Sequence, residues 1–457
     1  MTLWVDIDDL LFHLLHHSRP SGIQRVVFEI CAALRELRSH DVQFVRRGAD
    51  SADPRGFRTV DWSSIEALFR QIMEGNSAQN GSSRSAGSFP VTPPIEKVAS
   101  QDVLSTFLQA ESWALKELVT VPRALGHFAL DLGRAKMQER QQEKPSAQYD
   151  EGTKLADAAQ PGDVFLTLGA PWHHANYVQS IRWMRDELRM SFGMLMHDLV
   201  PVRHPEWCDR GIIITFKAWH SAILPLADMI FANSDATARD VQSYLAEQDV
   251  GTHVTVQTVP LGTGFGLADA LMAPEPIVQE PYVLFVSTIE ARKNHALLFR
   301  VWRRMLEEMS AENVPTLVFA GREGWLVSDL MQQLKNAEWL DGKIRFIQNP
   351  TDAELRRLYA DCSFTIFPSF FEGWGLPVTE SLSMGRPCLA SGTTSIPEAG
   401  GQLSRYFNPD NINEAYTLIR KTIEDTEGLK AWTEQVRSEF KPVPWTESAK
   451  AILKFIS

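Results

Sequence analysis

The stretch Phe371-Glu372-Gly373-Trp374-Gly375-Leu376-Pro377-Val378-Thr379-Glu380 follows a short apolar run at residues 364–367. The run predicts a buried strand. Pro377 and Gly385 suit the first position of a helix and the position after its end. Glu372 is therefore expected in a strand–helix loop and Glu380 in the helix, with two glycines between them. Because the N–H groups of a helix N-terminus bind anions, the stretch predicts a site for a phosphate beside hydroxyl groups, as in a nucleotide sugar.

Strand-like and helical patterns alternate on both sides of this stretch, which predicts parallel sheets covered on both faces. In the first half, strands are expected at 3–7, 42–45, 164–168, 191–196 and 229–232, and helices at 23–37, 177–190 and 215–227. The rhythm restarts at 282–286 and continues with helices at 294–309, 328–337 and 352–361 and strands at 316–320, 344–347 and 364–367. Thr351 is expected to cap the helix 352–361.

Three prolines in residues 272–281 predict a linker between the two blocks. We therefore expect an N-terminal domain at 1–270, a C-terminal domain at 271–440, and a final helix at 441–457 after the break at Pro442 and Pro444. Residues 76–142 do not fit the alternation of strand-like and helical segments and are treated as an insert. Its amphipathic part is interpreted either as surface helices packed on the first domain or as an acceptor-side or membrane-surface element.

Composition restricts the class of protein. The chain has 457 residues, a net charge of −12 and a pI of about 5.5, so it lacks the basic footprint of a nucleic-acid-binding protein. Its four cysteines are scattered without a CxxC pair, which predicts reduced thiols. Neither a targeting segment nor a membrane span is expected. The prediction is a cytoplasmic protein, with peripheral contact to the inner face of the plasma membrane left open.

Further candidate residues also follow predicted strands. Arg292 and Lys293 come after the strand 282–286, where adjacent cations can neutralise a diphosphate. His197 and Asp198 end the strand 191–196. Gly22 precedes the first long helix, where a glycine allows close backbone approach to a ligand. Ligands of such folds bind beyond the carboxyl ends of the strands, so these residues are expected to share one cleft.

Taken together, these motifs resemble the donor-site signature of glycosyltransferase family 4. The resemblance is carried by residues 368–377, Glu380, Met384-Gly385-Arg386-Pro387 and Ser395-Ile396-Pro397-Glu398, in order over about thirty positions. Where the family usually has Phe, this chain has Trp374. The resemblance implies the glycosyltransferase-B fold, in which two doubly wound Rossmann-like domains face each other across a cleft. It also implies a retaining, nucleotide-sugar-dependent hexosyltransferase.

By this resemblance, Glu372 and His197 line the reacting centre, and Glu380 accepts hydrogen bonds from the ribose. Contacts with the donor are implied for Gly22, Arg292, Lys293, Gly373, Trp374, Gly375 and Leu376. Thr288 is also assigned to the donor site. It stands where many family members place an Arg, which leaves Arg292 and Lys293 as the main cations of that site. Asp198 and Arg25 are assigned to the acceptor side.

The triplet Asp6-Ile7-Asp8 matches a metal-binding motif of a different glycosyltransferase fold. Such a triplet is common by chance, so we expect neither a metal nor a cofactor, and Asp8 is kept as an acceptor-side candidate. Trp172 and His173 follow a strand end and are candidates to line the cleft.

The predicted partners are a nucleotide sugar, with GDP-mannose favoured, and a glycan or polyprenyl-diphosphate-linked acceptor. The product would be a surface polysaccharide, O-antigen or lipid-linked oligosaccharide. Two alternatives stay open, a nucleotide-sugar epimerase and a non-catalytic scaffold of polysaccharide assembly. The oligomeric state is not predicted.

Overall fold

The computed structural model describes residues 1–17, 19–48, 53–75, 152–174, 176–250, 254–264, 272–273 and 275–456. The structural statements below concern these residues. The predicted insert at 76–142 lies outside them.

The first sheet has the strand order β3-β2-β1-β4-β5-β6-β7. Its strands are β1 (Leu3–Asp6), β2 (Val42–Arg47), β3 (Phe57–Val60), β4 (Val164–Thr167), β5 (Ser191–Met196), β6 (Met229–Ala232) and β7 (Thr255–Thr258). All neighbours are parallel except β2 and β3. In the register of the sheet, Asp6 lies between Val45 and Thr167 at the carboxyl end of β1. The polar residues that follow β1, β4 and β5 therefore meet at one edge.

The second sheet has the order β10-β9-β8-β11-β12-β13, and all its neighbours are parallel. Its strands are β8 (Tyr282–Val286), β9 (Thr316–Gly321), β10 (Ile344–Gln348), β11 (Phe364–Phe367), β12 (Cys388–Ser391) and β13 (Arg405–Phe407). Since β8 and β11 are neighbours, the loop with Arg292 and Lys293 and the loop with Glu372 leave the sheet side by side.

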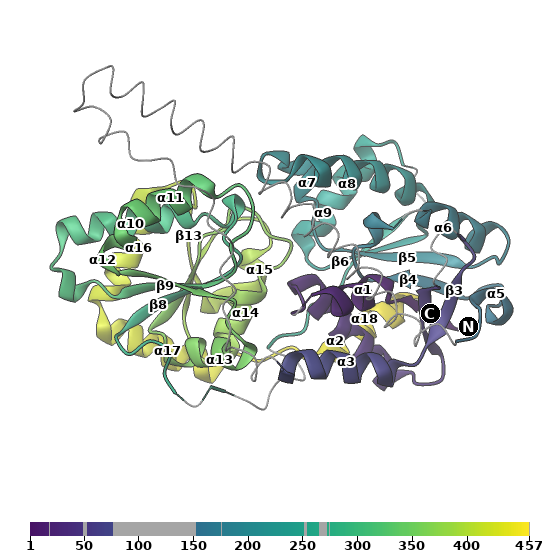
Figure 1. The fold of residues 1–457 in the computed structure, drawn as a ribbon, viewed down its shortest axis with the longest axis horizontal. Helices are drawn as coiled ribbons and strands as arrows, with labels where there is room; N and C mark the ends of the chain where they lie inside the picture. The colour runs from purple at the N-terminus through teal and green to yellow at the C-terminus, as the bar shows by residue number, and fades with distance from the viewer. Residues whose placement is uncertain are drawn as a thin grey trace, which may run out of the picture. The chain divides into compact units, whose positions relative to one another are not determined.

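Helices cover both faces of each sheet (Figure 1). Around the first sheet they are α1 (Asp8–His16), α2 (Gly22–Leu37), α3 (Trp62–Gly75), α5 (Leu155–Ala158), α6 (Tyr177–Asp186), α7 (Val200–Arg203), α8 (Arg210–Ile223) and α9 (Asp235–Glu247). Around the second they are α10 (His295–Glu308), α11 (Ser328–Asn336), α12 (Glu338–Asp341), α13 (Asp352–Asp361), α14 (Leu376–Ser383), α15 (Ile396–Gly400), α16 (Ile412–Glu424) and α17 (Thr426–Glu439). Short 3-10 turns are η2 (Pro171–His173), η3 (Pro205–Trp207), η4 (Leu224–Leu226), η6 (Ala291–Lys293), η7 (Ala311–Asn313) and η8 (Gly401–Leu403).

The last helix, α18 (Trp445–Ile456), packs against α2 of the first half. Its buried residues Ala449, Ile452 and Leu453 face the core. The Ser448 hydroxyl donates to the Pro260 carbonyl at 2.5 Å. The chain therefore returns to the first sheet after it has completed the second.

The predicted parallel α/β architecture is confirmed, and the differences are local. Thr351 caps α13 through a capping box with Glu354, as predicted. Helix α8 begins at Arg210 and not near 215, because the Asp209 side chain accepts the N–H of Gly211 and caps an earlier turn. The antiparallel strand β3 was not predicted, since only Phe57 of its four residues is buried. Among the described residues, no helix is long and apolar enough to cross a membrane, and the four cysteines are free thiols.

Candidate active site

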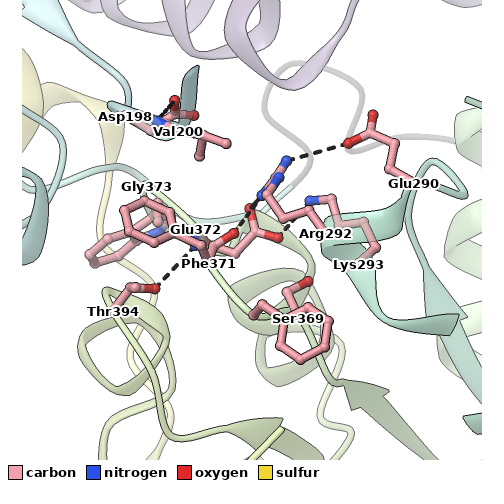
Figure 2. Close-up of polar contacts among 12 residues, drawn as sticks. Asp198, Val200, Glu290, Arg292, Lys293, Ser369, Phe371, Glu372, Gly373 and Thr394 are labelled. Carbon is pink, nitrogen blue, oxygen red and sulfur yellow. Dashed lines mark hydrogen bonds and ion pairs between the residues drawn. The ribbon is translucent and has the colours of Figure 1, made fainter. Parts of the chain in front are cut away.

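Glu372 lies between two cations beyond the carboxyl ends of β8 and β11 (Figure 2). Its Oε1 is 2.6 Å from Nζ of Lys293, and its Oε2 is 2.7 Å from Nη1 of Arg292. The other end of the guanidinium, Nη2, is 3.6 Å from Oε2 of Glu290. All four side chains are largely buried. The two cations predicted from the sequence therefore converge on the predicted carboxylate and are held by it.

In this cluster, burial disfavours the ionised form of each side chain, whereas the ion pairs favour it. For Glu372, desolvation alone would raise the pKa, but Arg292 and Lys293 outweigh it and lower the pKa to about 2. For Glu290, desolvation wins and the pKa is raised despite the same two cations. Burial, followed by repulsion from Arg292, lowers the pKa of Lys293. Of the two carboxylates, Glu372 is the one whose ionised form is strongly stabilised.

Gly373 brings the two halves of the chain into contact. A Cβ atom at this position would lie 1.8 Å from the backbone carbonyl oxygen of His197, so no other residue fits without a shift. The hydroxyl of Thr237, in α9, donates to the Gly373 carbonyl at 3.3 Å. Two predicted residues, His197 after β5 and Glu372 before Gly373, therefore lie on either side of one close backbone contact.

His197 is oriented by a hydrogen bond between its Nε2 and the carbonyl oxygen of Leu168, at 2.8 Å. Since a carbonyl can only accept, Nε2 carries the proton, and Nδ1 of the neutral ring is left as an acceptor. Burial lowers the pKa of His197, which favours this neutral form. Next to it, Asp198 accepts the N–H of Val200 at 3.1 Å through Oδ1.

Gly375 has φ of +118° and occupies the N-cap position of α14. A side chain would be strained in this conformation. Leu376 and Pro377 form the first turn of the helix, and Leu376 Cδ1 is 3.6 Å from the position that a Cβ of Gly22 would occupy. The N-terminus of α14 thus faces the start of α2, where Gly22 was predicted to allow close backbone approach to a ligand.

Glu380 is engaged through both of its oxygens. Oε1 accepts from Nη1 of Arg25 at 2.9 Å, and Oε2 accepts from the Tyr359 hydroxyl at 2.9 Å. Arg25 also bonds Asp352 through Nη2 at 3.1 Å. Desolvation raises the pKa of Glu380, and Arg25 opposes this effect. Arg25, assigned to the acceptor side by resemblance, is thus placed against the carboxylate that the resemblance assigns to the ribose.

A further contact between the halves involves Glu398, in the Ser-Ile-Pro-Glu segment. Its carboxylate accepts the backbone N–H groups of Asp235 at 2.7 Å and Ala236 at 2.8 Å. These amides belong to the first turn of α9, whose N-terminus favours a negative charge. Glu398 belongs to the predicted signature, but its capping role was not predicted, because the amides come from a distant helix.

The acidic triplet at the end of β1 is occupied by protein partners. Asp6 accepts from the Tyr177 hydroxyl at 2.6 Å, and burial raises its pKa to about 7. Asp8 lies 3.7 Å from Nδ1 of His174 and 3.9 Å from Nε of Arg46, and burial raises its pKa. Asp8 is therefore a buried, paired carboxylate close to the site edge. Its pairing with His174 was not predicted from the sequence.

Thr288 follows β8 at a place where backbone segments approach closely. Its Cγ2 is 2.8 Å from the position of a Cβ on Gly324. It carries no charge, so among the described residues at this loop the positive charge comes from Arg292 and Lys293. Trp374 is half-buried, and its indole nitrogen has no hydrogen-bond partner among the described residues.

Comparison with solved structures identifies the class of fold. HepE of Anabaena, solved in complex with UDP, aligns with 100% of this chain and 99% of its own, at a TM-score of 0.54 and 13% identity. A trehalose-phosphate synthase of Burkholderia xenovorans aligns with 66% of this chain and 73% of its own, at a TM-score of 0.51 and 12% identity. The protein has the glycosyltransferase-B fold, as the sequence predicted.

Sequence comparison finds a family match in the second half of the chain. Residues 269–439 match the model of the glycosyl transferases group 1 family. WbdA, a serotype-specific mannosyltransferase of Escherichia coli, is 30% identical over 275 residues, which cover 57% of this chain and 33% of WbdA. O-antigen chain mannosyltransferase B of Escherichia coli is 30% identical over 252 residues, which cover 54% of this chain and 65% of that protein. The chain therefore spans a third to about two thirds of these curated relatives. The matches confirm the predicted mannosyltransferase-like family resemblance.

Proposed function

We propose that this chain is a retaining glycosyltransferase that transfers mannose from GDP-mannose to an O-antigen or another lipid-linked glycan. The observation that carries the proposal is the buried Glu372, held between Arg292 and Lys293 and adjacent to His197 through the Gly373 contact. The names of WbdA and of mannosyltransferase B support mannose as the sugar and O-antigen as the product. A third relative, from Komagataeibacter xylinus, is named as a GDP-mannose-dependent enzyme acting on cellobiosyl-diphosphopolyprenol and is 27% identical.

In the proposed reaction, an acceptor hydroxyl oxygen forms a bond to C1 of the donor sugar. The bond from C1 to the phosphate oxygen breaks, and its electron pair leaves with the nucleoside diphosphate. The hydroxyl proton moves to a departing phosphate oxygen on the same face, which retains the anomeric configuration. Arg292 and Lys293 stabilise the negative charge that develops on the diphosphate, and the N-terminus of α14 adds oriented N–H groups.

Glu372 and His197 act on the sugar side of that bond. The ionised Glu372 stabilises positive charge near C1 and keeps Arg292 and Lys293 in place before substrate binds. Nδ1 of the neutral His197 accepts a hydrogen bond from a sugar hydroxyl. We further propose that the two cations make a metal ion unnecessary, so that turnover is unchanged by EDTA.

The test is a turnover assay of the purified chain with GDP-mannose, UDP-glucose and UDP-N-acetylglucosamine, in which release of the nucleoside diphosphate is measured with a lipid-linked glycan acceptor. Proton NMR of the product reports the anomeric configuration. We expect transfer from GDP-mannose with retention, and a loss of at least about 100-fold in Lys293→Ala. Lys335→Ala, a change on the exposed face of α11, is the matched control. An inverted product, or a Lys293→Ala variant that turns over like the control, would overturn the proposal.

A further inference from the structure

A segment rich in hydroxyl groups, residues 391–395, lies along the loop that follows β11. Ser391 ends β12, and its hydroxyl donates to the carbonyl of Ser369 at 2.6 Å. The Thr393 hydroxyl donates to the carbonyl of Phe370 at 3.0 Å. The loop is therefore held by side chains of another segment before it reaches the candidate catalytic carboxylate.

The next two residues of this segment bond both backbone groups of Glu372. The N–H of Glu372 donates to the Thr394 hydroxyl at 3.1 Å (Figure 2). The Ser395 hydroxyl donates to the Glu372 carbonyl at 2.8 Å. The peptide that precedes Glu372 is also bonded on its other side, since the Phe371 carbonyl accepts from Nη1 of Arg292 at 2.6 Å. The backbone of Glu372 is thus fixed on both sides, while its carboxylate is held by the two cations.

Thr394 adopts a backbone conformation that its side chain disfavours. Its φ is +52°, in the left-handed region. A β-branched residue is rarely found there, whereas glycine adopts this region freely. Such strained residues persist only where the surrounding structure fixes them, and they cluster at functional sites. What the chain gains from threonine at this position is a hydroxyl oxygen for the N–H of Glu372, which glycine does not offer.

Both ends of the segment are anchored. Ser391 belongs to β12, which lies between β11 and β13 in the second sheet. Ser395 has no exposed surface and immediately precedes α15. The Glu398 side chain of that helix accepts the first amides of α9 in the other half of the chain. A segment fixed at both ends can hold a neighbouring loop in one conformation.

We propose that Thr394 and Ser395 are positioning residues for the carboxylate of Glu372, an inference that rests on the function proposed above. They act through Glu372 and not on the substrate. By fixing its backbone, they keep the ionised side chain in place before the donor binds. Groups that are already oriented need no rearrangement in the transition state, and this is a main source of catalysis.

The experiment compares Thr394→Val with Thr394→Ser in the turnover assay described above. Valine keeps the branched shape and removes the hydroxyl. It should lower kcat about 10- to 100-fold, the cost of misplacing a catalytic group, and change KM by less than about twofold, because the donor contacts remain. Serine restores the hydroxyl and should recover most of kcat. Thr422→Val is the matched control, because the buried Thr422 hydroxyl donates to the Leu418 carbonyl within α16 at 2.8 Å.

A merely structural role predicts a different result. Loss of one buried hydrogen bond would lower the unfolding midpoint of Thr394→Val and of Thr422→Val alike, and kcat per folded molecule would stay unchanged in both. Thr394→Gly separates folding from positioning, since glycine accepts the left-handed conformation without strain and also lacks the hydroxyl. It should unfold no earlier than Thr394→Val and should have the same low kcat.

A double-mutant cycle with Glu372→Gln tests whether Thr394 acts through Glu372. In the Glu372→Gln background, Thr394→Val should cause little further loss of kcat, because the carboxylate that it positions is absent. An equal loss with and without that carboxylate would overturn the inference, as would a kcat in Thr394→Val equal to that of Thr422→Val. In either case, transfer by the wild type would leave the proposed function standing.

The same cycle can be measured by thermal unfolding, which requires no substrate. Thr394→Val should reduce the stability that is lost in Glu372→Gln, because the carboxylate is then held less firmly between its cations. If the wild type transfers no sugar, the proposed function fails and this measurement decides the inference alone. Additive losses in the two variants would then overturn it.

Discussion

Replacing Glu372 by Gln should destabilise the protein strongly, although the two side chains have nearly the same shape. Glu372 is buried against Arg292 and Lys293, and its pKa is lowered from the ordinary value of 4.5 to about 2. At about 1.4 kcal/mol per pKa unit, this shift corresponds to a contribution of about 3 kcal/mol to the unfolding free energy. The Gln side chain cannot balance two buried cations, which also makes the loss large.

The pH dependence of this effect has a definite sign. The folded pKa lies below the unfolded value, so the stabilisation is fully present above about pH 4.5. It is lost as the pH falls from 4.5 towards 2. The difference between wild type and Glu372→Gln should therefore be about 3 kcal/mol at pH 7 and less than half of that near pH 3. At neutral pH the expected drop in unfolding midpoint is about 6–12 °C.

Glu290→Gln is the matched control, because Glu290 is also buried and lies 3.6 Å from Arg292. Desolvation raises its pKa, so its charged form costs stability in the fold and its replacement should cause no loss at pH 7. Thermal unfolding followed by tryptophan fluorescence at several pH values measures both variants. Equal midpoints for the two variants at pH 7, or a loss in Glu372→Gln that does not shrink in acid, would refute a stabilising charge on Glu372.

Three further results are expected. Gly373→Ala should lower the unfolding free energy by about 1–3 kcal/mol and abolish transfer, because its Cβ would overlap the His197 carbonyl oxygen, whereas Gly392→Ala meets atoms no closer than 3.6 Å and should do neither. Arg25→Gln should lower the unfolding midpoint, because Arg25 is paired with Glu380. GDP should nevertheless raise the midpoint of this variant by more than that of wild type, because the ribose no longer competes with Arg25 for the Glu380 carboxylate. Equal rises would exclude such competition. Asp6→Asn should be more stable than wild type at pH 8 in a urea titration, since burial raises the Asp6 pKa to about 7, and the gain should vanish below about pH 4; a gain that persists in acid would contradict this cause.

The sheets could be predicted because their strands leave a strong local pattern. The residues of β8, for example, are almost all buried and form one apolar run bounded by a proline and a serine. The position of Glu372 after β11 and of Lys293 after β8 then follows from the rule that sites lie at the carboxyl ends of parallel strands. That these two residues form an ion pair was not predicted, but both were placed in the same cleft.

Contacts between the two halves could not be predicted in this way. Arg25 and Glu380 are 355 residues apart in sequence, and no periodicity relates a residue of one sheet to a residue of the other. The pairing of Asp8 with His174 could not be predicted either. The two residues are far apart in sequence and become neighbours only when β1 and β4 pair.

The capping of α9 by Glu398 has a consequence for how the chain is made. The amides of Asp235 and Ala236 emerge from the ribosome long before the carboxylate that satisfies them. The apolar face of α2 likewise stays uncovered until residues 445–456 are synthesised, because α18 is the helix that packs on it. Domains made first usually fold first. Here, however, the helix that covers α2 beside the first sheet is synthesised only after the whole second sheet. A nascent chain stopped near residue 264 should therefore expose apolar surface and bind chaperones, and one extended through residue 456 should be released from them.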